Sequence, residues 1–163
     1  MSDAFINIRG NASDDTFVSA ASDALGQDLP TEPNTTSRGD HCVFWLGPDE
    51  WMVMSAVENR AEMLEKLESA LASTHSAVND LSGGNVTYSL SGADVLDVLA
   101  QGCTIDFALM KVGDCAQTGL GKAGVLISRE GDSEFKVIVR RSFADYLGKW
   151  LEHAGRAREI VFQ

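Results

Sequence analysis

Apolar residues recur along the first half of the chain at two spacings, one typical of strands and one of helices. Alternation and short apolar runs predict strands over residues 4–10, 42–46, 51–55 and 75–82. Apolar residues three and four apart predict helices over residues 12–26, with Ser13 as the N-cap, and over residues 58–73. Residues 27–40 hold two of the three prolines and show no periodicity, so they are expected to form a loop.

The second half of the chain repeats this order of elements. Strands are expected over residues 85–92, 134–140 and 158–163. Residues 115–120 and 123–130 supply the strand material between the helices, and residues 123–130 are expected to pair with residues 134–140. Ser91 and Asp94 resemble a capping box in front of a short apolar helix, and Ser142 is expected to cap a helix over residues 142–155. Each half therefore has the order β-α-β-β-α-β. We predict an α+β fold with two ferredoxin-like lobes in tandem, residues 1–82 and 83–163, in one compact two-lobed unit.

The charge of the chain excludes several classes of partner. The formal net charge is −11, with only 13 Lys and Arg residues, so no basic face is available for nucleic acid or for an anionic membrane surface. No run of 18 apolar residues exists to span a bilayer, and the N-terminus lacks the apolar core of a signal peptide. The three cysteines form no CxxC pair and the three histidines are scattered, so we expect reduced thiols, no metal site and a cytoplasmic protein.

One glycine-rich motif matches the dinucleotide-binding pattern in its letters. "GLGKAG", residues 119–124, fits G-x-G-x-x-G, but the residues after it read as a strand and not as a helix. Without a helix N-terminus to meet a pyrophosphate, the motif predicts a turn between two strands.

Few polar residues stand out as ligand anchors. Asp80 follows a predicted strand and precedes Leu81-Ser82-Gly83-Gly84, where it could be functional, although an Asx-type turn contact is favoured. Arg140 and Arg141 lie where the last long strand meets the final helix. They could bind a carboxylate, although a surface or interface ion pair is favoured.

The stretch "FWLGPDEWMVM", residues 44–54, predicts a hairpin that is apolar on both faces. Such a hairpin is expected to be covered on both sides, by the helices of the chain and by a partner chain. Aromatic residues and Met are enriched at protein interfaces. The predicted interface residues are Trp45, Trp51, Met52 and Met54, and no ligand pocket is expected here.

Several stretches together resemble one known family. "INIRG", "WLGPDEWMVM", "VNDLSGGNVTYSLSG", "VLAQGCTIDF" and "RRSFADYLGKWLEHA" occur in the order found in the gamma subunit of heterotetrameric sarcosine oxidase, and the resemblance covers nearly the whole chain. It implies a complex that oxidatively demethylates sarcosine to glycine, with alpha, beta and delta subunits as partners. FAD, FMN, NAD, zinc and tetrahydrofolate are implied on those partners. The gamma-type chain itself is implied to be a structural subunit, with no catalytic, cofactor-binding or metal-binding residue.

This family is in turn similar to part of the folate-binding aminomethyltransferase (T-protein) fold, through "DLSGGNVTYSLSGADVLDVL" and "EFKVIVRRSFADYLGKWL". The chain departs from that fold in two places. Gly83 stands where a His follows Asp-x-Ser there, and residues 121–125, near the expected catalytic Asp, contain Lys122 but no carboxylate. Two alternatives stay open: a gamma-type subunit of a related N-methyl amino acid dehydrogenase or oxidase, or a stand-alone folate- or small-molecule-binding protein anchored by Asp80, Arg140 and Arg141.

Overall fold

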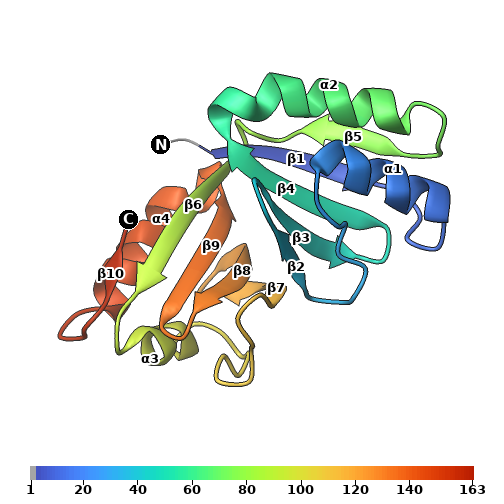
Figure 1. Cartoon of the computed structure of the whole chain (residues 1–163). Helices are drawn as coiled ribbons and strands as arrows, with labels where there is room; N and C mark the ends of the chain where they lie inside the picture. The colour runs from blue at the N-terminus through green and yellow to red at the C-terminus, as the bar shows by residue number, and fades with distance from the viewer. Residues whose placement is uncertain (1–2) are drawn as a thin grey trace. The chain divides into compact units, whose positions relative to one another are not determined.

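The computed structural model describes residues 3–163. The chain divides into two compact units, Met1–Gly83 and Gly84–Gln163 (Figure 1). Among the described residues, no helix combines the length and the apolar character needed to span a bilayer.

The first unit is a five-stranded antiparallel sheet with two helices on one face (Figure 1). The strand order is β2-β3-β4-β1-β5, and a single 3-10 turn, Val57–Asn59, precedes the second helix. The elements in chain order are β1 (Asp3–Arg9), α1 (Asp15–Leu25), β2 (Thr36–Arg38), β3 (Cys42–Gly47), β4 (Glu50–Ala56), α2 (Arg60–Leu71) and β5 (Ala77–Asp80).

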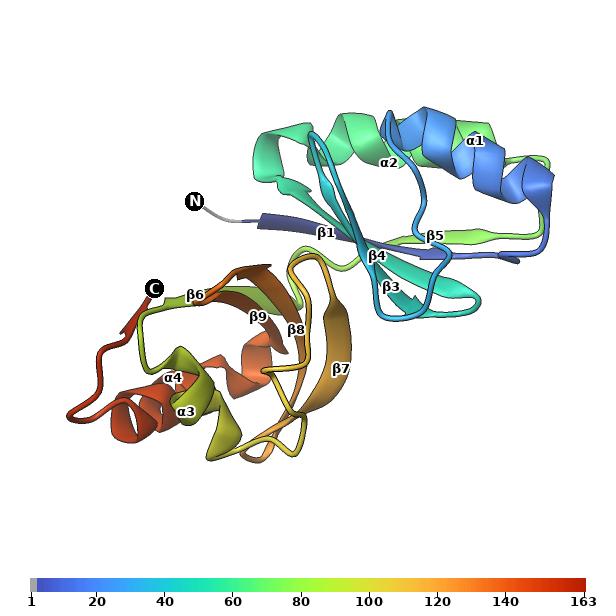
Figure 2. The same cartoon turned by 60° about the horizontal axis from the view of Figure 1, so that its bottom comes forward.

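The second unit repeats the same architecture. Its strand order is β10-β6-β9-β8-β7, and Figure 2 shows α3 and α4 on the same side of this sheet. The elements in chain order are β6 (Asn85–Ser91), α3 (Val95–Ala100), β7 (Cys115–Leu120), β8 (Ala123–Gly131), β9 (Glu134–Arg140), α4 (Arg141–Ala154) and β10 (Val161–Phe162).

The predicted pair of ferredoxin-like lobes is confirmed by the strand order. When β2 is left out, the first sheet has the antiparallel order β5-β1-β4-β3, and when β7 is left out, the second has the order β10-β6-β9-β8. This is the arrangement that the split βαβ repeat produces. Each unit also adds one edge strand, β2 or β7, between its first helix and its hairpin. Because the addition occurs at the same place in both units, it strengthens the case for an internal duplication.

The β2 strand corrects the expectation that residues 27–40 form only a loop. Thr36–Arg38 pairs with β3, in the register Thr36↔Phe44 and Ser37↔Val43. Gln27 holds the strand near the end of α1, because its side-chain amide donates to Ser37 Oγ at 3.0 Å. Three residues are too few to show a strand period, so only the pairing with β3 identifies this segment as a strand.

Strand alternation explains the core of the first unit. In β1 and β4 the residues on one face are buried against α1 and α2, as expected for a sheet with helices on one side. The strand residues in this cluster are Ile6, Ile8, Val43, Trp51 and Val53. The helix residues that meet them are Phe17, Ala21 and Leu25 of α1 and Met63, Leu67 and Leu71 of α2.

The core of the second unit is built in the same way. Alternate residues of β6, β8 and β9 pack against the apolar stripes of α3 and α4 (Figure 2). The largest fully buried members are Leu90, Leu99, Leu120, Ile127 and Phe135. The apolar spacing in the sequence therefore identified the buried faces of both units correctly.

Helix N-termini were the least accurate part of the sequence prediction. The N-cap of α1 is Asp14 and not Ser13, because the Asp14 carboxylate accepts the N–H groups of Thr16 at 2.9 Å and Phe17 at 3.4 Å. Ser142 does not cap α4, since β9 runs directly into the helix and Arg140 occupies the N-cap position without a side-chain bond.

The expected capping box at α3 is also wrong. Asp94 occupies the N-cap position but makes no side-chain bond to the helix. Its carboxylate instead accepts the backbone N–H of Glu159 at 2.8 Å. Asp94 therefore ties the start of α3 to the segment that leads into β10.

Candidate functional site

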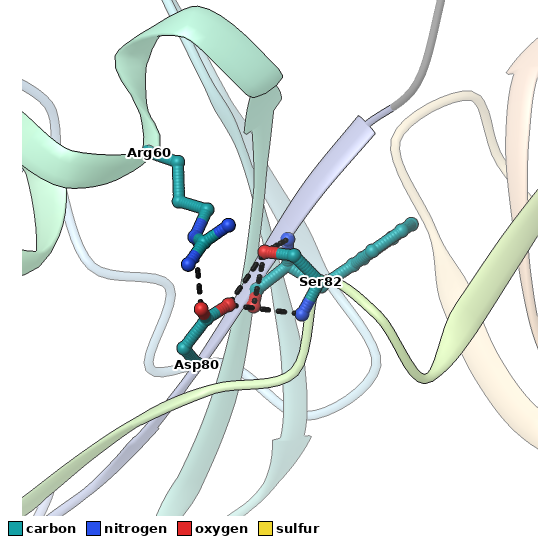
Figure 3. Close-up of polar contacts among 4 residues, drawn as sticks. Arg60, Asp80 and Ser82 are labelled. Atoms are coloured by element: carbon teal, nitrogen blue, oxygen red, sulfur yellow. Dashed lines mark hydrogen bonds and ion pairs between the residues drawn. The ribbon is translucent and has the colours of Figure 1, made fainter.

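Asp80 lies at the end of β5 in a small polar cluster with Ser82 and Arg60 (Figure 3). The Asp80 Oδ1 atom accepts the Ser82 hydroxyl at 2.6 Å and the Ser82 backbone N–H at 3.0 Å. The Arg60 Nε group, at the first residue of α2, lies 2.8 Å from Asp80 Oδ2. The expected Asx-type turn contact is confirmed, and both carboxylate oxygens have partners within the first unit.

Ser82 connects this cluster to β1, the neighbour of β5 in the sheet. Its hydroxyl oxygen accepts the backbone N–H of Phe5 at 3.0 Å, and the N–H of Leu81 donates to the Phe5 carbonyl at 2.7 Å. The hydrogen bond from the Ser82 hydroxyl is the main cause that holds the pKa of Asp80 below its ordinary value, and the bond from the Ser82 backbone N–H adds to it. Arg60 lowers this pKa as well. The cluster therefore holds a charged carboxylate that fastens the chain after β5 to β1 and α2.

Replacing Asp80 by asparagine is expected to lower the stability of the first unit by about 1 kcal/mol at pH 7. Because the folded pKa of Asp80 is lowered, the folded chain binds this proton less readily than the unfolded chain. The stabilisation is therefore complete above the unfolded pKa of about 3.9 and is lost as pH falls through the folded value. The difference in melting temperature between wild type and Asp80→Asn should be constant near pH 7 and should begin to shrink as the pH falls below about 4.

A matched control is Glu62→Gln, which removes an exposed ion pair with Lys66 on α2 in the same unit. Lys66 lowers the pKa of Glu62, but the pair is exposed to solvent, so the change in melting temperature should be smaller than that of Asp80→Asn at pH 7. A difference between Asp80→Asn and wild type that stays constant down to pH 3 would show that the carboxylate charge does not provide the stabilisation.

Arg140 and Arg141 belong to the second unit, so no single unit contains all three expected anchors. Both side chains are exposed. The backbone N–H of Arg141 donates to the Gly84 carbonyl at 2.9 Å, and its guanidinium lies 3.5 Å from the Asn85 carbonyl oxygen. These contacts fasten the start of α4 to the start of β6, and the role of the two arginines as ligand anchors stays a prediction.

The hairpin predicted at residues 44–54 is present as β3 and β4, but its tryptophan and methionine residues lie on different faces. Trp51 is fully buried in the core cluster of the first unit, and Trp45, its register partner, packs against the same cluster. Strand alternation places Met52 and Met54 on the opposite face.

Trp51 is therefore excluded from the predicted interface. It has no exposed surface, its ring centroid lies 5.5 Å from that of Phe17, and its Nε1–H donates to the Pro30 carbonyl at 2.7 Å. For Trp45, Met52 and Met54, contact with a partner chain stays a prediction.

The glycine-rich motif forms the turn that was expected. β7 ends at Leu120 and β8 begins at Ala123, so Gly121 and Lys122 connect two antiparallel strands. Gly121 has φ +60, and the backbone N–H of Lys122 donates to the Tyr146 hydroxyl at 3.0 Å. No helix follows the motif, so the backbone geometry of a dinucleotide loop does not arise here.

Only the central glycine of the motif is expected to be essential. A Cβ on Gly121 would lie 2.6 Å from the Tyr146 hydroxyl at a left-handed φ, so Gly121→Ala should cost about 1–3 kcal/mol in urea unfolding. Gly119→Ala is the control, because no atom lies within 4 Å of its Cβ position and its φ is not left-handed. It should be neutral or stabilising by up to about 1 kcal/mol. Equal losses in the two variants would contradict this account.

Hollows in the first unit include two that contain a histidine. One, of about 430 Å³, is lined in part by Asp3, His41 and Ser55, and His41 Nδ1 lies 3.0 Å from Ser55 Oγ. Burial lowers the pKa of His41, which favours the neutral ring. The other, of about 560 Å³, includes Arg9 and His75. Within residues 3–163, no three His, Cys, Asp or Glu side chains are placed to hold a metal ion.

Arg129 on β8 is an organising residue that sequence reasoning missed. Its Nη1 group donates to the carbonyl oxygens of Phe107 at 3.2 Å and Met110 at 2.6 Å. Its Nε and Nη2 groups donate to the carbonyl oxygens of Gly131 at 3.1 Å and Asp132 at 2.7 Å. One side chain thus fastens residues 106–114, here named the 106–114 loop, to the β8–β9 turn.

Comparison with known proteins places the chain in a family. A sequence profile described as "Sarcosine oxidase, gamma subunit family" matches residues 9–157. The chain belongs to this family. The resemblance inferred from the sequence motifs is thereby confirmed for nearly the whole gamma-type chain.

Relatives agree with this assignment. Sarcosine oxidase subunit gamma from Corynebacterium sp. (strain U-96) is 32% identical over 111 residues, covering 67% of this chain and 53% of that protein. The gamma-type chain thus spans about half the length of this curated relative. A chain of the solved heterotetrameric sarcosine oxidase from Corynebacterium sp. U-96, in complex with pyrrole 2-carboxylate, has a TM-score of 0.87 at 27% identity. That match covers 94% of this chain and 80% of the solved one.

A more distant structural match confirms the expected fold resemblance. Glycine cleavage system aminomethyltransferase T from Bartonella henselae has a TM-score of 0.66 at 17% identity, covering 91% of this chain and 43% of that protein. At this identity the match speaks for the fold alone.

Proposed function

We propose that the chain is a non-catalytic, structural gamma subunit of a multi-subunit flavoenzyme that oxidatively demethylates sarcosine to glycine. In this proposal the one-carbon unit passes to tetrahydrofolate, and FAD, FMN, NAD and zinc are held by the alpha, beta and delta partner subunits. The observation that carries the proposal is the structural match over 94% of the chain to a chain of a heterotetrameric sarcosine oxidase. The cytoplasmic location expected from the number and spacing of the cysteines stays part of the proposal.

The chemistry of the candidate residues supports a non-catalytic role. A catalytic carboxylate needs an oxygen that can reach a substrate proton or ligand. Both oxygens of Asp80 instead contact Ser82 and Arg60, and the cluster fastens two secondary-structure elements. Residues 121–125, near the catalytic Asp of the aminomethyltransferase family, form a turn and strand start with no carboxylate.

The structural role does not depend on which N-methyl amino acid is demethylated, because a structural subunit need not contact the substrate. Sarcosine is proposed because the related proteins are named for it. A complex that demethylates another N-methyl amino acid would preserve the structural role and change only the substrate.

The structural role can be separated from catalysis by mutation within the assembled complex. A triple variant, Asp80→Asn with Arg140→Gln and Arg141→Gln, should turn over sarcosine at a rate within about twofold of wild type, since none of these groups is proposed to touch substrate. Deletion of the chain should prevent recovery of the assembled enzyme. A loss of kcat of about 100-fold or more in a triple variant that still assembles would show that this chain takes part in the chemistry.

A further inference from the structure

His41 lies where several segments of the first unit meet. It belongs to the turn between β2 and β3, and Nδ1 of its ring lies 3.0 Å from the hydroxyl oxygen of Ser55 on β4. Its backbone N–H donates to the Gln27 side-chain oxygen at 3.3 Å, and the Gln27 amide donates to Ser37 of β2 at 3.0 Å. One residue thus connects the end of α1, the edge strand β2 and β4.

Ser55 is buried on the face of the sheet that the helices cover. It is 6% exposed, and strand alternation places its side chain on the same side as Trp51 and Val53, which pack against α1 and α2. Ala4, its register partner on β1, has no exposed surface. The cover over Ser55 therefore comes from elements of the first unit.

The Ser55 hydroxyl depends on the imidazole for its hydrogen bond. His41 is its only hydrogen-bond partner among residues 3–163. A buried hydroxyl needs an acceptor for its proton, so the Ser55 O–H donates to Nδ1, and the neutral ring carries its own proton on Nε2. Protonation of the ring turns Nδ1 into a donor and leaves the Ser55 O–H group without an acceptor.

The surroundings of the ring act in the same direction. Burial is the largest cause that lowers the pKa of His41, and Lys66 on α2 lowers it as well, whereas Asp40 raises it. The hollow of about 430 Å³ beside the ring is lined by titratable or charged residues of β1, β2, the β2–β3 turn, β3 and the 3-10 turn, which are Asp3, Arg38, Asp40, Cys42 and Glu58. A protonated ring that leaves Ser55 thus enters a polar space with carboxylates.

The edge strand β2 is the part of the sheet that this contact controls most directly. It pairs with β3 through three residues, and His41 lies in the turn that joins the two strands. Within that turn the Gly39 N–H donates to the His41 carbonyl at 3.0 Å. Short segments at the edge of a fold open at a lower cost in free energy than its central strands. Movement of His41 therefore acts first on residues 36–41.

We propose that protonation of His41 releases its ring from Ser55 and loosens residues 36–41 from the sheet. The folded chain binds this proton less readily than the unfolded chain, because the folded pKa of His41 is lowered. The stabilisation is therefore complete above the unfolded pKa of about 6.5 and is lost as pH falls through the lower folded value. The inference concerns the first unit alone and does not depend on the proposed function.

Hydrogen exchange measured by mass spectrometry tests the proposal on the full chain as purified from its host, with any subunits that accompany it. Backbone exchange over residues 36–41, corrected for the intrinsic effect of pH, should be at least about threefold faster at about pH 5.5 than at about pH 7.5. Exchange of the Cε1 hydrogen of His41 reports on the ring itself. Its midpoint should lie at a lower pH than in the urea-unfolded chain.

Two histidine variants assign the response to one ring. His41→Gln cannot be protonated but keeps a side-chain oxygen that can accept from Ser55, so its corrected exchange over residues 36–41 should be the same at both pH values. His75→Gln is the matched control, because His75 is exposed between α2 and β5 in the same unit. This variant should keep the pH response of wild type.

A third variant tests the partner of the ring. Ser55→Ala removes the hydroxyl that loses its acceptor, so residues 36–41 should exchange faster than in wild type at about pH 7.5 and respond less to acid. An equal pH response in His41→Gln and wild type would overturn the proposal, as would the absence of a response in wild type. If circular dichroism shows that His41→Gln does not fold, an unchanged pH response in Ser55→Ala overturns it instead.

Discussion

Replacing Trp51 by alanine is expected to destabilise the first unit by about 3–5 kcal/mol, because the indole is fully buried in its core. The variant loses the packing against Phe17 and leaves the Pro30 carbonyl without its hydrogen bond. Urea unfolding followed by circular dichroism measures the change. Since the chain has two units, the transition of the first unit should move while that of the second stays in place.

Two variants define what the Trp51 result means. Trp51→Phe keeps an aromatic ring and should cost only about 1–3 kcal/mol, chiefly through the lost hydrogen bond and the smaller ring. Trp45→Ala should cost less than Trp51→Ala, because Trp45 is only partly buried. If Trp51→Ala left stability unchanged but prevented assembly with partners, Trp51 would be an interface residue after all.

Replacing Arg129 by methionine is expected to release the 106–114 loop and to cost about 2–4 kcal/mol. Methionine keeps much of the apolar length of the side chain but leaves the carbonyl oxygens of Phe107 and Met110 without their charged donor. Limited proteolysis provides a direct test, because Lys111 places a trypsin site within the loop. Cleavage after Lys111 should be slow in wild type and at least tenfold faster in Arg129→Met.

Arg129→Lys is the matched control for this experiment. A lysine keeps the positive charge, but its single ammonium group cannot reproduce the planar fork that reaches both the loop and the β8–β9 turn. Its cleavage rate should therefore fall between those of wild type and Arg129→Met. An unchanged cleavage rate in Arg129→Met would show that the Arg129 guanidinium is not needed to hold the loop.

The sequence allowed the fold to be predicted because both cores follow regular spacings. The apolar alternation of β1, β4, β8 and β9 and the three-four spacing of α2 and α4 are strong enough to identify the elements and their buried faces. The family could also be predicted, because distinctive stretches such as "WLGPDEW" lie in these same elements.

The helix caps were predicted less well, and the short edge strand is identified only by its pairing with β3. Ser13 and Asp14 are both good N-caps, and only the backbone geometry decides for Asp14. Asp94 has the spacing of a capping residue, but its carboxylate accepts a hydrogen bond from the backbone N–H of Glu159, 65 residues later in the chain.

The most informative side chain in the second unit gave no local signal at all. Arg129 stands between Ser128 and Glu130 at the polar end of β8, and its partners Phe107 and Met110 lie 22 and 19 residues earlier in the chain.

The measurement that tests the central claim most directly is a native purification of the tagged chain from its own host, with mass and visible absorption recorded on the eluted species. The account predicts a yellow complex several times the mass of this chain that demethylates sarcosine or a related N-methyl amino acid. A colourless, stable monomer that binds reduced folate would contradict it and would favour a stand-alone folate-binding protein.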